Sequence, residues 1–318
     1  MKYIFYKVLE KIKTKIVLNK NIKAIVNEMN NDDVIIFGRV FIALIFLPIM
    51  KKKKLTSKVV VRDAIHLEFF DKKVKKNMLK YFPTMVNKFI VSSDESIEAY
   101  KKFFKVDSIN MEKIYNPLGI IPNHKFNFGA KTVVSIGRFD TQKGFENLIK
   151  AFDRVHNKHK DWVLKLYGNG DCEYKRLLED TIEALIAKDY VKILPPTKNV
   201  VEVFNNSSIF VLPSRYEGYA NILVEAMACG MPCISFDWYM GVEEIKKDTQ
   251  NGLIAYLEDR QKYFKGEQTE KDINSLKEKM ENLIENESYS AKLSKEATKI
   301  AETRNIDIII DKWINIIK

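Results

Sequence analysis

Short apolar runs alternate with amphipathic helical segments through the second half of the chain, and this alternation constrains the fold more than any other feature. The run Thr132–Ile136 ends at Gly137, and apolar residues then recur at helical spacing. The runs Trp162–Tyr167 and Ile209–Leu212 are followed in the same way by a loop and a helical segment. Strict alternation predicts an α/β protein with a parallel sheet and helices on both faces. Such sheets bind ligands at the carboxyl ends of their strands.

The first half of the chain follows the same plan less regularly. Its expected elements are strands at Asp33–Phe37, Val59–Val61 and Lys88–Ser93, an apolar helix at Phe41–Met50, and a helix over residues 94–104. The apolar stretch Phe41–Leu47 is too short to span a bilayer, and no signal peptide is evident. Residues 116–127 carry two prolines and little periodicity, which is typical of a linker.

Charge divides the chain more sharply than composition does. Residues 1–128 hold 25 Lys/Arg and 12 Asp/Glu, whereas residues 129–318 hold 28 and 30, so a strongly basic half is followed by a nearly neutral one. A basic half is typical of a protein that meets nucleic acid, an anionic membrane or a polyanionic substrate, although a solvated surface is an alternative. No nucleic-acid recognition motif accompanies the lysines, so no nucleic-acid partner is expected. The three cysteines form no C-x-x-C pair or even framework, which disfavours zinc and disulfides.

Two loops that follow predicted strands carry the residues best suited to chemistry. In the first, Arg138 and Lys143 follow Gly137, and two cations at a sheet edge can neutralise a diphosphate. In the second, Glu217 precedes a predicted helix whose N-cap is expected at Asn221, and helix N-termini favour anions. Taken singly, Arg138 could belong to a structural salt bridge and Glu217 could cap a loop.

A series of ordered motifs over residues 110–260 resembles the nucleotide-sugar-binding domain of retaining GT-B glycosyltransferases, the family 4 or group 1 class. Glu217 and Glu225 have the family's E-x7-E spacing. A lone E-x7-E carries no weight, but the whole series in order is specific. The motifs are Asn116-Pro117, Gly137-Arg138, Lys143-Gly144, Gly168-Asn169-Gly170, Pro213-Ser214, Glu217-Gly218, Glu225-Ala226, Gly230-Met231-Pro232, Gly241, Glu244 and Asn251-Gly252-Leu253.

The resemblance implies a GT-B fold, with two Rossmann-like domains facing a cleft and an N-terminal domain that is shortened here. We expect an N-terminal, acceptor-side domain over residues 1–118 and a linker over 119–130. A C-terminal nucleotide-sugar-binding domain over 131–302 would follow. The helix over 303–318 is expected to pack back on the N-terminal domain.

The resemblance also implies a role for each site residue. The catalytic set comprises Arg138 and Lys143 on the donor diphosphate, Glu217 on the donor sugar, and a histidine for which His66 is the best candidate, although Arg62 or Asp63 could take its place. Donor binding is expected at Gly137, Gly218, Tyr219, Ala220, Asn221, Glu225, Leu194 and Pro195, with Glu225 on the ribose and Leu194-Pro195 near the base. No metal and no cofactor are expected, because protein cations neutralise the diphosphate in such enzymes.

The implied activity is retaining transfer of a sugar, by same-face attack, from a nucleotide-diphosphate sugar, most simply a UDP-sugar, to a glycan or lipid-linked acceptor. Such an enzyme would serve capsule, lipopolysaccharide or glycolipid synthesis, in the cytoplasm and peripherally on the inner face of the cell membrane. Its basic half would meet an anionic membrane surface.

The N-terminal domain is short for this family, by roughly 50–70 residues on domain-size grounds. A natural shortening, a misassigned start or a partner protein that completes the N-terminal side are all open explanations. The alternative function is therefore a non-catalytic nucleotide-sugar-binding subunit that needs a partner chain. A nucleotide-sugar epimerase would share the architecture, but the paired glutamates and cations are typical of the transferases.

Overall fold

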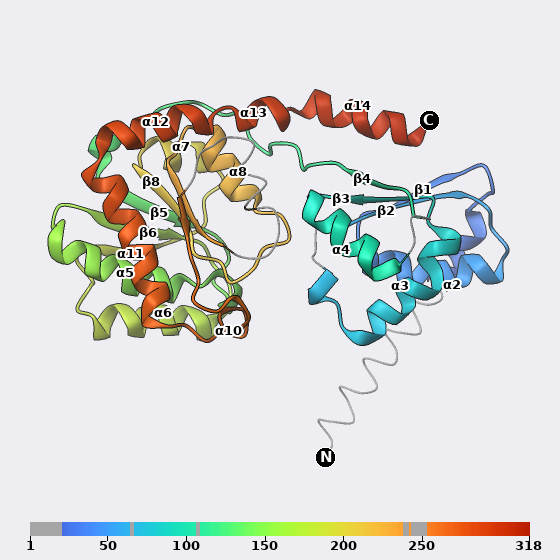
Figure 1. Ribbon diagram of the computed structural model, residues 1–318, viewed down its shortest axis with the longest axis horizontal. Helices are drawn as coiled ribbons and strands as arrows, with labels where there is room; N and C mark the ends of the chain where they lie inside the picture. The colour runs from blue at the N-terminus through green and yellow to red at the C-terminus, as the bar shows by residue number, and fades with distance from the viewer. Residues whose placement is uncertain (1–20, 64–66, 106–108, 238–241, 243–252) are drawn as a thin grey trace, which may run out of the picture. The chain divides into compact units, whose positions relative to one another are not determined.

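Two compact units make up the protein, Met1–Ile114 together with Ile317–Lys318, and Tyr115–Ile316 (Figure 1). The structure, a computed structural model, describes residues 21–63, 67–105, 109–237, 242 and 253–318. Within the described residues, both units are built on parallel sheets, as the alternating pattern predicts.

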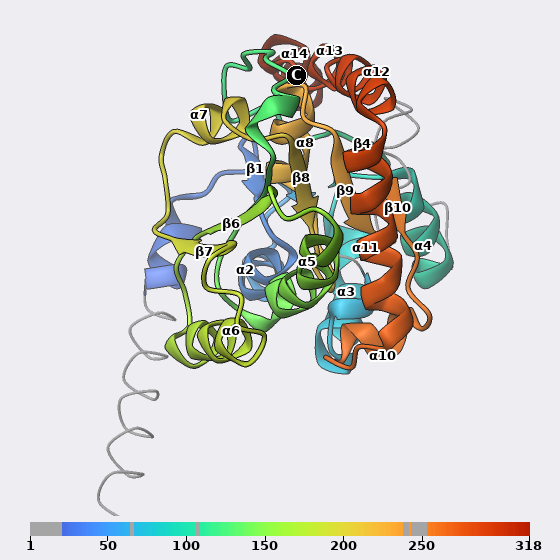
Figure 2. The same ribbon diagram turned by 90° about the vertical axis from the view of Figure 1, so that its left-hand side faces the viewer.

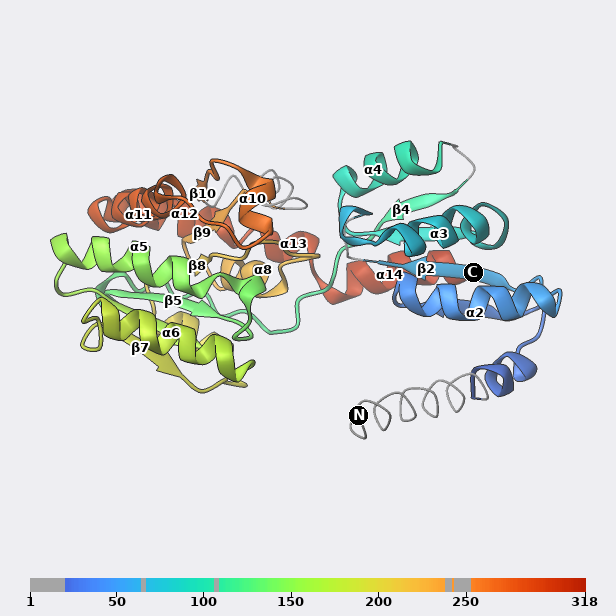
Figure 3. The same ribbon diagram turned by 90° about the horizontal axis from the view of Figure 1, so that it is seen from below.

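The first unit contains a four-stranded sheet in the order β1-β2-β3-β4 within its described residues. After a helix over residues 21–28, its elements are β1 (Val34–Phe37), α2 (Val40–Lys52), β2 (Lys58–Arg62), η1 (Leu67–Phe69), α3 (Lys72–Met85), β3 (Lys88–Val91), α4 (Asp94–Phe104) and β4 (Met111–Lys113). Neighbouring strands of this sheet are consecutive in the chain. The connecting helices α2, α3 and α4 lie on one side of it (Figure 1 and Figure 3), as right-handed crossovers between such strands require.

Local sequence explains why these helices form where they do. In α3, Val74, Met78 and Phe82 are buried at a spacing of four residues, which makes one apolar stripe. The carboxylate of Asp71 accepts a hydrogen bond from the backbone N–H of Val74 at 2.7 Å and caps the first turn. In α4, Ser93 performs the same function by accepting from the N–H of Ser96. The predicted elements of this half are thus confirmed.

The second unit contains a six-stranded sheet in the order β10-β9-β8-β5-β6-β7 within its described residues. The strands are β5 (Thr132–Ile136), β6 (Val163–Tyr167), β7 (Val191–Leu194), β8 (Ile209–Leu212), β9 (Cys233–Phe236) and β10 (Leu253–Ala255). The helices are η2 (Phe128–Ala130), η3 (Thr141–Lys143), α5 (Phe145–Lys158), α6 (Cys172–Ala184), α7 (Val200–Asn205), α8 (Asn221–Ala228), α10 (Arg260–Phe264), α11 (Glu270–Glu285), α12 (Glu287–Ala297), α13 (Ile300–Thr303) and α14 (Ile306–Ile317).

The strand order of this sheet alone indicates where a ligand binds. From β5 the chain proceeds outward to β6 and β7, and it then returns to add β8 on the other side of β5. The helices α5, α6 and α11 cover one face of the sheet, and α7, α8 and α12 cover the other (Figure 2). The carboxyl ends of β5 and β8 therefore flank the point where the winding reverses, which is where open α/β sheets bind their ligands.

Candidate active site

The loop after β5 and the loop after β6 run in backbone contact at the carboxyl edge of the sheet. The N–H of Gly137 donates to the carbonyl of Tyr167 at 3.0 Å, and the N–H of Phe139 donates to that of Asn169 at 2.8 Å. A Cβ atom on Gly168 would lie 1.9 Å from the carbonyl oxygen of Gly137. Glycine is required at position 168 because no side chain fits between the two backbones.

Gly144 lies where the first candidate loop packs closely against the second. Its φ of +61° lies in the left-handed region, and a Cβ atom there would lie 2.5 Å from the carbonyl oxygen of Pro213. The backbone N–H of Arg215 also donates to the carbonyl of Gln142 at 2.7 Å. The short helix η3, which ends at Lys143, is therefore held directly against the loop that follows β8.

Lys143 and Glu217 meet at the centre of this arrangement, although they lie 74 residues apart in the chain. The ammonium nitrogen Nζ of Lys143 lies 2.7 Å from Oε1 of Glu217, and the two side chains are only 12% and 9% exposed. The hydroxyl of Ser214 donates to the same carboxylate oxygen at 2.5 Å. A cation and an acid from the two predicted loops thus form one buried group.

Arg138 lies at the same edge but points toward solvent. Its side chain is 70% exposed, and a guanidinium nitrogen lies 3.1 Å from Oδ2 of Asp140. Gln142 lies within 3.5 Å of the same guanidinium and donates to the carbonyl of Tyr216 at 3.0 Å. The Arg138 charge is therefore accessible, whereas that of Lys143 is buried.

The helix α8 begins at Asn221, and this corrects the predicted cap. Ala220, not Asn221, occupies the N-cap position, and it makes no side-chain capping bond. The amide of Asn221 is engaged elsewhere, because its Oδ1 accepts a hydrogen bond from Nδ2 of Asn116 at 2.7 Å. The loop Gly218–Ala220 therefore leads into α8 without a capping hydrogen bond from the N-cap side chain.

Glu225 lies eight residues beyond Glu217, in the second turn of α8, and is half-buried. Burial raises the pKa of its carboxyl above the ordinary value, while a hydrogen bond from the backbone N–H of Gly119 acts in the opposite direction. Glu225 is therefore not an ordinary exposed helix residue. Its immediate neighbour is the segment that enters the unit at Tyr115.

The remaining predicted donor residues lie at the ends of neighbouring strands. Leu194 ends β7, and its carbonyl accepts a hydrogen bond from the N–H of Gly168 at 3.1 Å. Pro195 follows it and is exposed. The predicted histidine, His66, lies outside the described residues.

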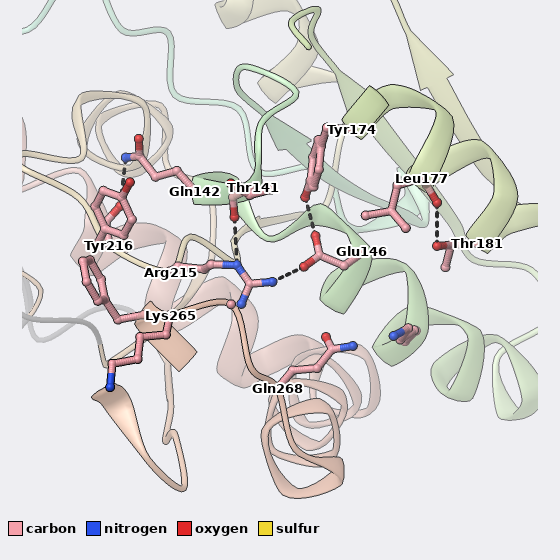
Figure 4. Close-up of a pocket in the computed structure, with 13 residues that line it drawn as sticks. Thr141, Gln142, Glu146, Tyr174, Leu177, Thr181, Arg215, Tyr216, Lys265 and Gln268 are labelled. Atoms are coloured by element: carbon pink, nitrogen blue, oxygen red, sulfur yellow. Dashed lines mark hydrogen bonds and ion pairs between the residues drawn. The ribbon is translucent and has the colours of Figure 1, made fainter. Parts of the chain in front are cut away.

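A buried ion pair that no sequence motif indicates supports the two loops. The guanidinium of Arg215 pairs with Glu146 on α5, and its Nε donates to the carbonyl of Thr141 at 2.8 Å (Figure 4). Tyr174 from α6 donates its hydroxyl to the same glutamate, and burial raises the pKa of that hydroxyl. The only available sequence signal was the position of Arg215 between Ser214 and Glu217.

These residues line a cavity of about 520 Å³, which Figure 4 shows in close-up. Its wall comes from η3, α5, α6 and the turn after α10, and it does not include Arg138, Lys143 or Glu217. The cavity thus lies beside the Lys143–Glu217 pair and is separate from it. Among the described residues, no group of three or more His, Cys, Asp or Glu side chains could hold a metal ion.

The family model for glycosyl transferases group 1 matches residues 120–300, which is more than half of the chain. An uncharacterized glycosyltransferase of Haemophilus influenzae is 26% identical over 302 residues, covering 94% of this chain and 80% of that protein. The amylovoran biosynthesis glycosyltransferase AmsD of Erwinia amylovora is 28% identical over 228 residues, covering 68% of this chain and 62% of that protein.

The fold has solved counterparts as well. The crystal structure of the pneumococcal O-GlcNAc transferase GtfA in complex with UDP and GlcNAc matches with a TM-score of 0.73 at 17% identity. The match covers 94% of this chain and 59% of that one, so the present chain spans about three fifths of its length. The predicted α/β class and GT-B resemblance are confirmed, and the chain belongs to the group 1 glycosyl transferases.

Proposed function

We propose that this chain transfers a sugar from a UDP-sugar to a glycan or lipid-linked acceptor, with retention of configuration at the transferred carbon. The observation that carries the proposal is the buried Lys143–Glu217 pair at the point where the winding of the sheet reverses. The relatives named for amylovoran biosynthesis and for O-GlcNAc transfer support a role in polysaccharide or glycoconjugate synthesis.

Each loop has a separate task in the proposed reaction. As the bond between the sugar and the diphosphate breaks, negative charge grows on the departing phosphate oxygen, and preorganised cations stabilise it. Lys143 and Arg138 supply those cations, one buried and one exposed. The carboxylate of Glu217 accepts hydrogen bonds from hydroxyls of the donor sugar, and Ser214 holds it in place.

The rest of the donor is assigned to the loop before α8, to α8 itself and to the end of β7. The backbone N–H groups of Gly218 to Ala220 serve the sugar and phosphate at the start of α8, where the helix dipole favours an anion. The N–H of Asn221 instead donates to the carbonyl of Tyr219 at 2.9 Å. Glu225 accepts hydrogen bonds from the ribose hydroxyls, and Leu194-Pro195 borders the base.

In the proposed chemical step, the acceptor hydroxyl oxygen attacks the sugar carbon from the face that the diphosphate leaves. The bonding pair goes to the phosphate oxygen, and that oxygen also receives the proton of the acceptor hydroxyl. No covalent intermediate with the enzyme forms. The proposal assigns the neutralising charge to the protein and requires no metal ion.

We extend the proposal to peripheral binding at the inner face of the cell membrane, where a lipid-linked acceptor would lie. In the first unit, Lys51–Lys54 are all exposed in the last turn of the apolar helix α2 and directly beyond it. The same helix leaves Phe41, Ile42 and Ile45 more than 40% exposed. Each lysine near an anionic surface adds about 1 kcal/mol of attraction. No helix among the described residues is long and apolar enough to cross a bilayer. The protein should float with anionic liposomes at moderate salt, and failure to float would contradict this extension.

The experiment that tests the proposed reaction is the release of UDP from a panel of UDP-sugars by the purified chain. UDP-glucose, UDP-galactose, UDP-N-acetylglucosamine and UDP-N-acetylgalactosamine form the panel, with and without a membrane extract as the source of acceptor. We expect release from at least one donor, and its loss in Glu217→Ala.

A second candidate function is a nucleotide-sugar-binding subunit that a partner chain completes. GtfA, whose fold this chain shares, is named as a subunit and has been solved as a GtfA/B complex. Binding of UDP without any release from the panel would favour the subunit. If the chain neither bound UDP nor released it from any donor of the panel, both functions would be contradicted.

A further inference from the structure

Arg304, at the end of α13, is the largest fully buried side chain among the described residues. It is 0% exposed and lies beyond the segment that the family model matches. The helix α13 packs against α8, which carries Glu225 (Figure 1). A buried guanidinium is costly unless its hydrogen bonds are satisfied, so its partners show which parts of the fold depend on it.

The side chain of Arg304 makes a specific contact with the donor loop. Its Nε donates to the hydroxyl oxygen of Tyr219 at 2.8 Å, and one terminal nitrogen donates to Oγ1 of Thr303 at 2.5 Å. The guanidinium carbon lies over the Tyr115 ring, 3.3 Å from its centre, which is a cation–π contact. A planar guanidinium held on one ring face and directed at one hydroxyl has a single orientation.

The backbone of Arg304 makes a second contact, with the segment that leads to Glu225. Its carbonyl accepts a hydrogen bond from the N–H of Leu118 at 3.0 Å. The next residue along the chain is Gly119, whose N–H donates to the carboxylate of Glu225. One buried residue thus touches both arms of the site, the loop at Tyr219 and the segment beside Glu225.

We propose that Arg304 is a positioning residue for the nucleotide-sugar donor, acting through Tyr219 on the transferred sugar and through Leu118 on the ribose. This inference rests on the proposed function, because it needs a donor at the Glu217–Glu225 loop. Arg304 has no assigned contact with a reacting atom, so its effect passes through the two segments that it holds.

Tyr219→Phe is the sharpest test, because it removes one hydroxyl and leaves the ring in place. We expect kcat for UDP release from the preferred UDP-sugar to fall about tenfold, the loss expected for one hydrogen bond to a charged group. The Kd for UDP, measured by calorimetry, should change less than about threefold, because the Leu118–Gly119 arm is untouched. Tyr289→Phe, on the exposed side of α12, is the matched control and should leave both values unchanged.

Arg304→Lys tests both arms, since it keeps the charge but loses the planar fork. We expect it to lower kcat and weaken UDP binding together. Arg154→Lys is its control, because Arg154 pairs with Glu270 on the surface, away from the site. Thermal melts of each variant show whether the fold has been lost.

Three results separate the outcomes. A fall in kcat in Tyr219→Phe, at a melting temperature close to that of the wild type, supports positioning. Wild-type kcat and UDP affinity in both variants would overturn it, whether or not their melting temperatures fall, because Arg304 would then be structural only. A wild-type chain that binds no UDP and turns over no UDP-sugar would overturn the proposed function and, with it, the donor that Arg304 positions.

Discussion

Replacing Arg138 by alanine separates catalysis from stability better than any other change in the site. The side chain is 70% exposed and its ion pair with Asp140, at 3.1 Å, is a surface pair. Such pairs contribute about 0.2–1 kcal/mol. Arg138→Ala should therefore lose less than about 1 kcal/mol of unfolding free energy, measured by urea denaturation.

Its effect on turnover should be far larger. If the guanidinium stabilises charge on the departing diphosphate, its removal costs on the order of 10²–10³ in kcat. The assay is UDP release from the preferred UDP-sugar, with Arg154→Ala as a control that loses a comparable surface pair outside the site. Turnover of Arg138→Ala within a few-fold of the control would refute the assigned role, because the fold of both variants remains intact.

Four further predictions concern the rest of the site. Lys143→Ala should lose turnover and also about 3 kcal/mol of stability, because it leaves Glu217 buried without its cation; the double variant Lys143→Ala/Glu217→Ala should lose less stability than the sum of the single changes. Burial raises the pKa of Glu225 in the folded protein above its value in the unfolded chain. The contribution of this carboxyl to the unfolding free energy is therefore fully present below the unfolded-state pKa and is lost as the pH rises through the folded-state pKa. Thermal melts of Glu225→Gln over the same pH range should lack this pH dependence. UDP affinity of the wild type should fall as the pH drops through that same folded pKa. Gly168→Ala should unfold the loop edge or the protein, since its Cβ would lie 1.9 Å from the carbonyl oxygen of Gly137, and circular dichroism will show which. EDTA should leave UDP release unchanged, and a loss that Mg²⁺ restores would contradict metal-independent transfer.

The strands and helices could be predicted from the sequence because their apolar periodicity is local. The run Thr132–Ile136 becomes β5 with the same bounds, and the run Trp162–Tyr167 becomes β6 with one residue fewer at its start. The order of the sheet carries no comparable local signal. That β8 returns to lie beside β5 depends on packing between segments about 75 residues apart, and only the structure shows it.

The site was predictable where short motifs carry the chemistry. The motif residues Lys143 and Glu217 were selected from the two loops, and the structure brings them into contact. Their roles toward a donor remain predictions. The helix cap was predicted wrongly at Asn221 because its amide bonds to Asn116, a partner 105 residues away.

Two further residues that hold the site could not be predicted either, because their partners are also distant in the sequence. Arg215 and Arg304 are buried cations whose partners lie on distant elements, so their surroundings in the sequence resemble ordinary surface segments. Their burial is evident only when the fold is known. Both hold backbone or side-chain groups of the loops that carry the motifs.

In the proposed function, the loops after β5 and β8 bind the diphosphate of a UDP-sugar, with Lys143 as the buried cation. The most direct measurement is the shift in unfolding free energy that saturating UDP produces in the wild type and in Lys143→Met. At one hundred times its dissociation constant, UDP should stabilise the wild type by about 2.7 kcal/mol, and at the same concentration it should stabilise the variant far less. An equal shift in both proteins would contradict the account.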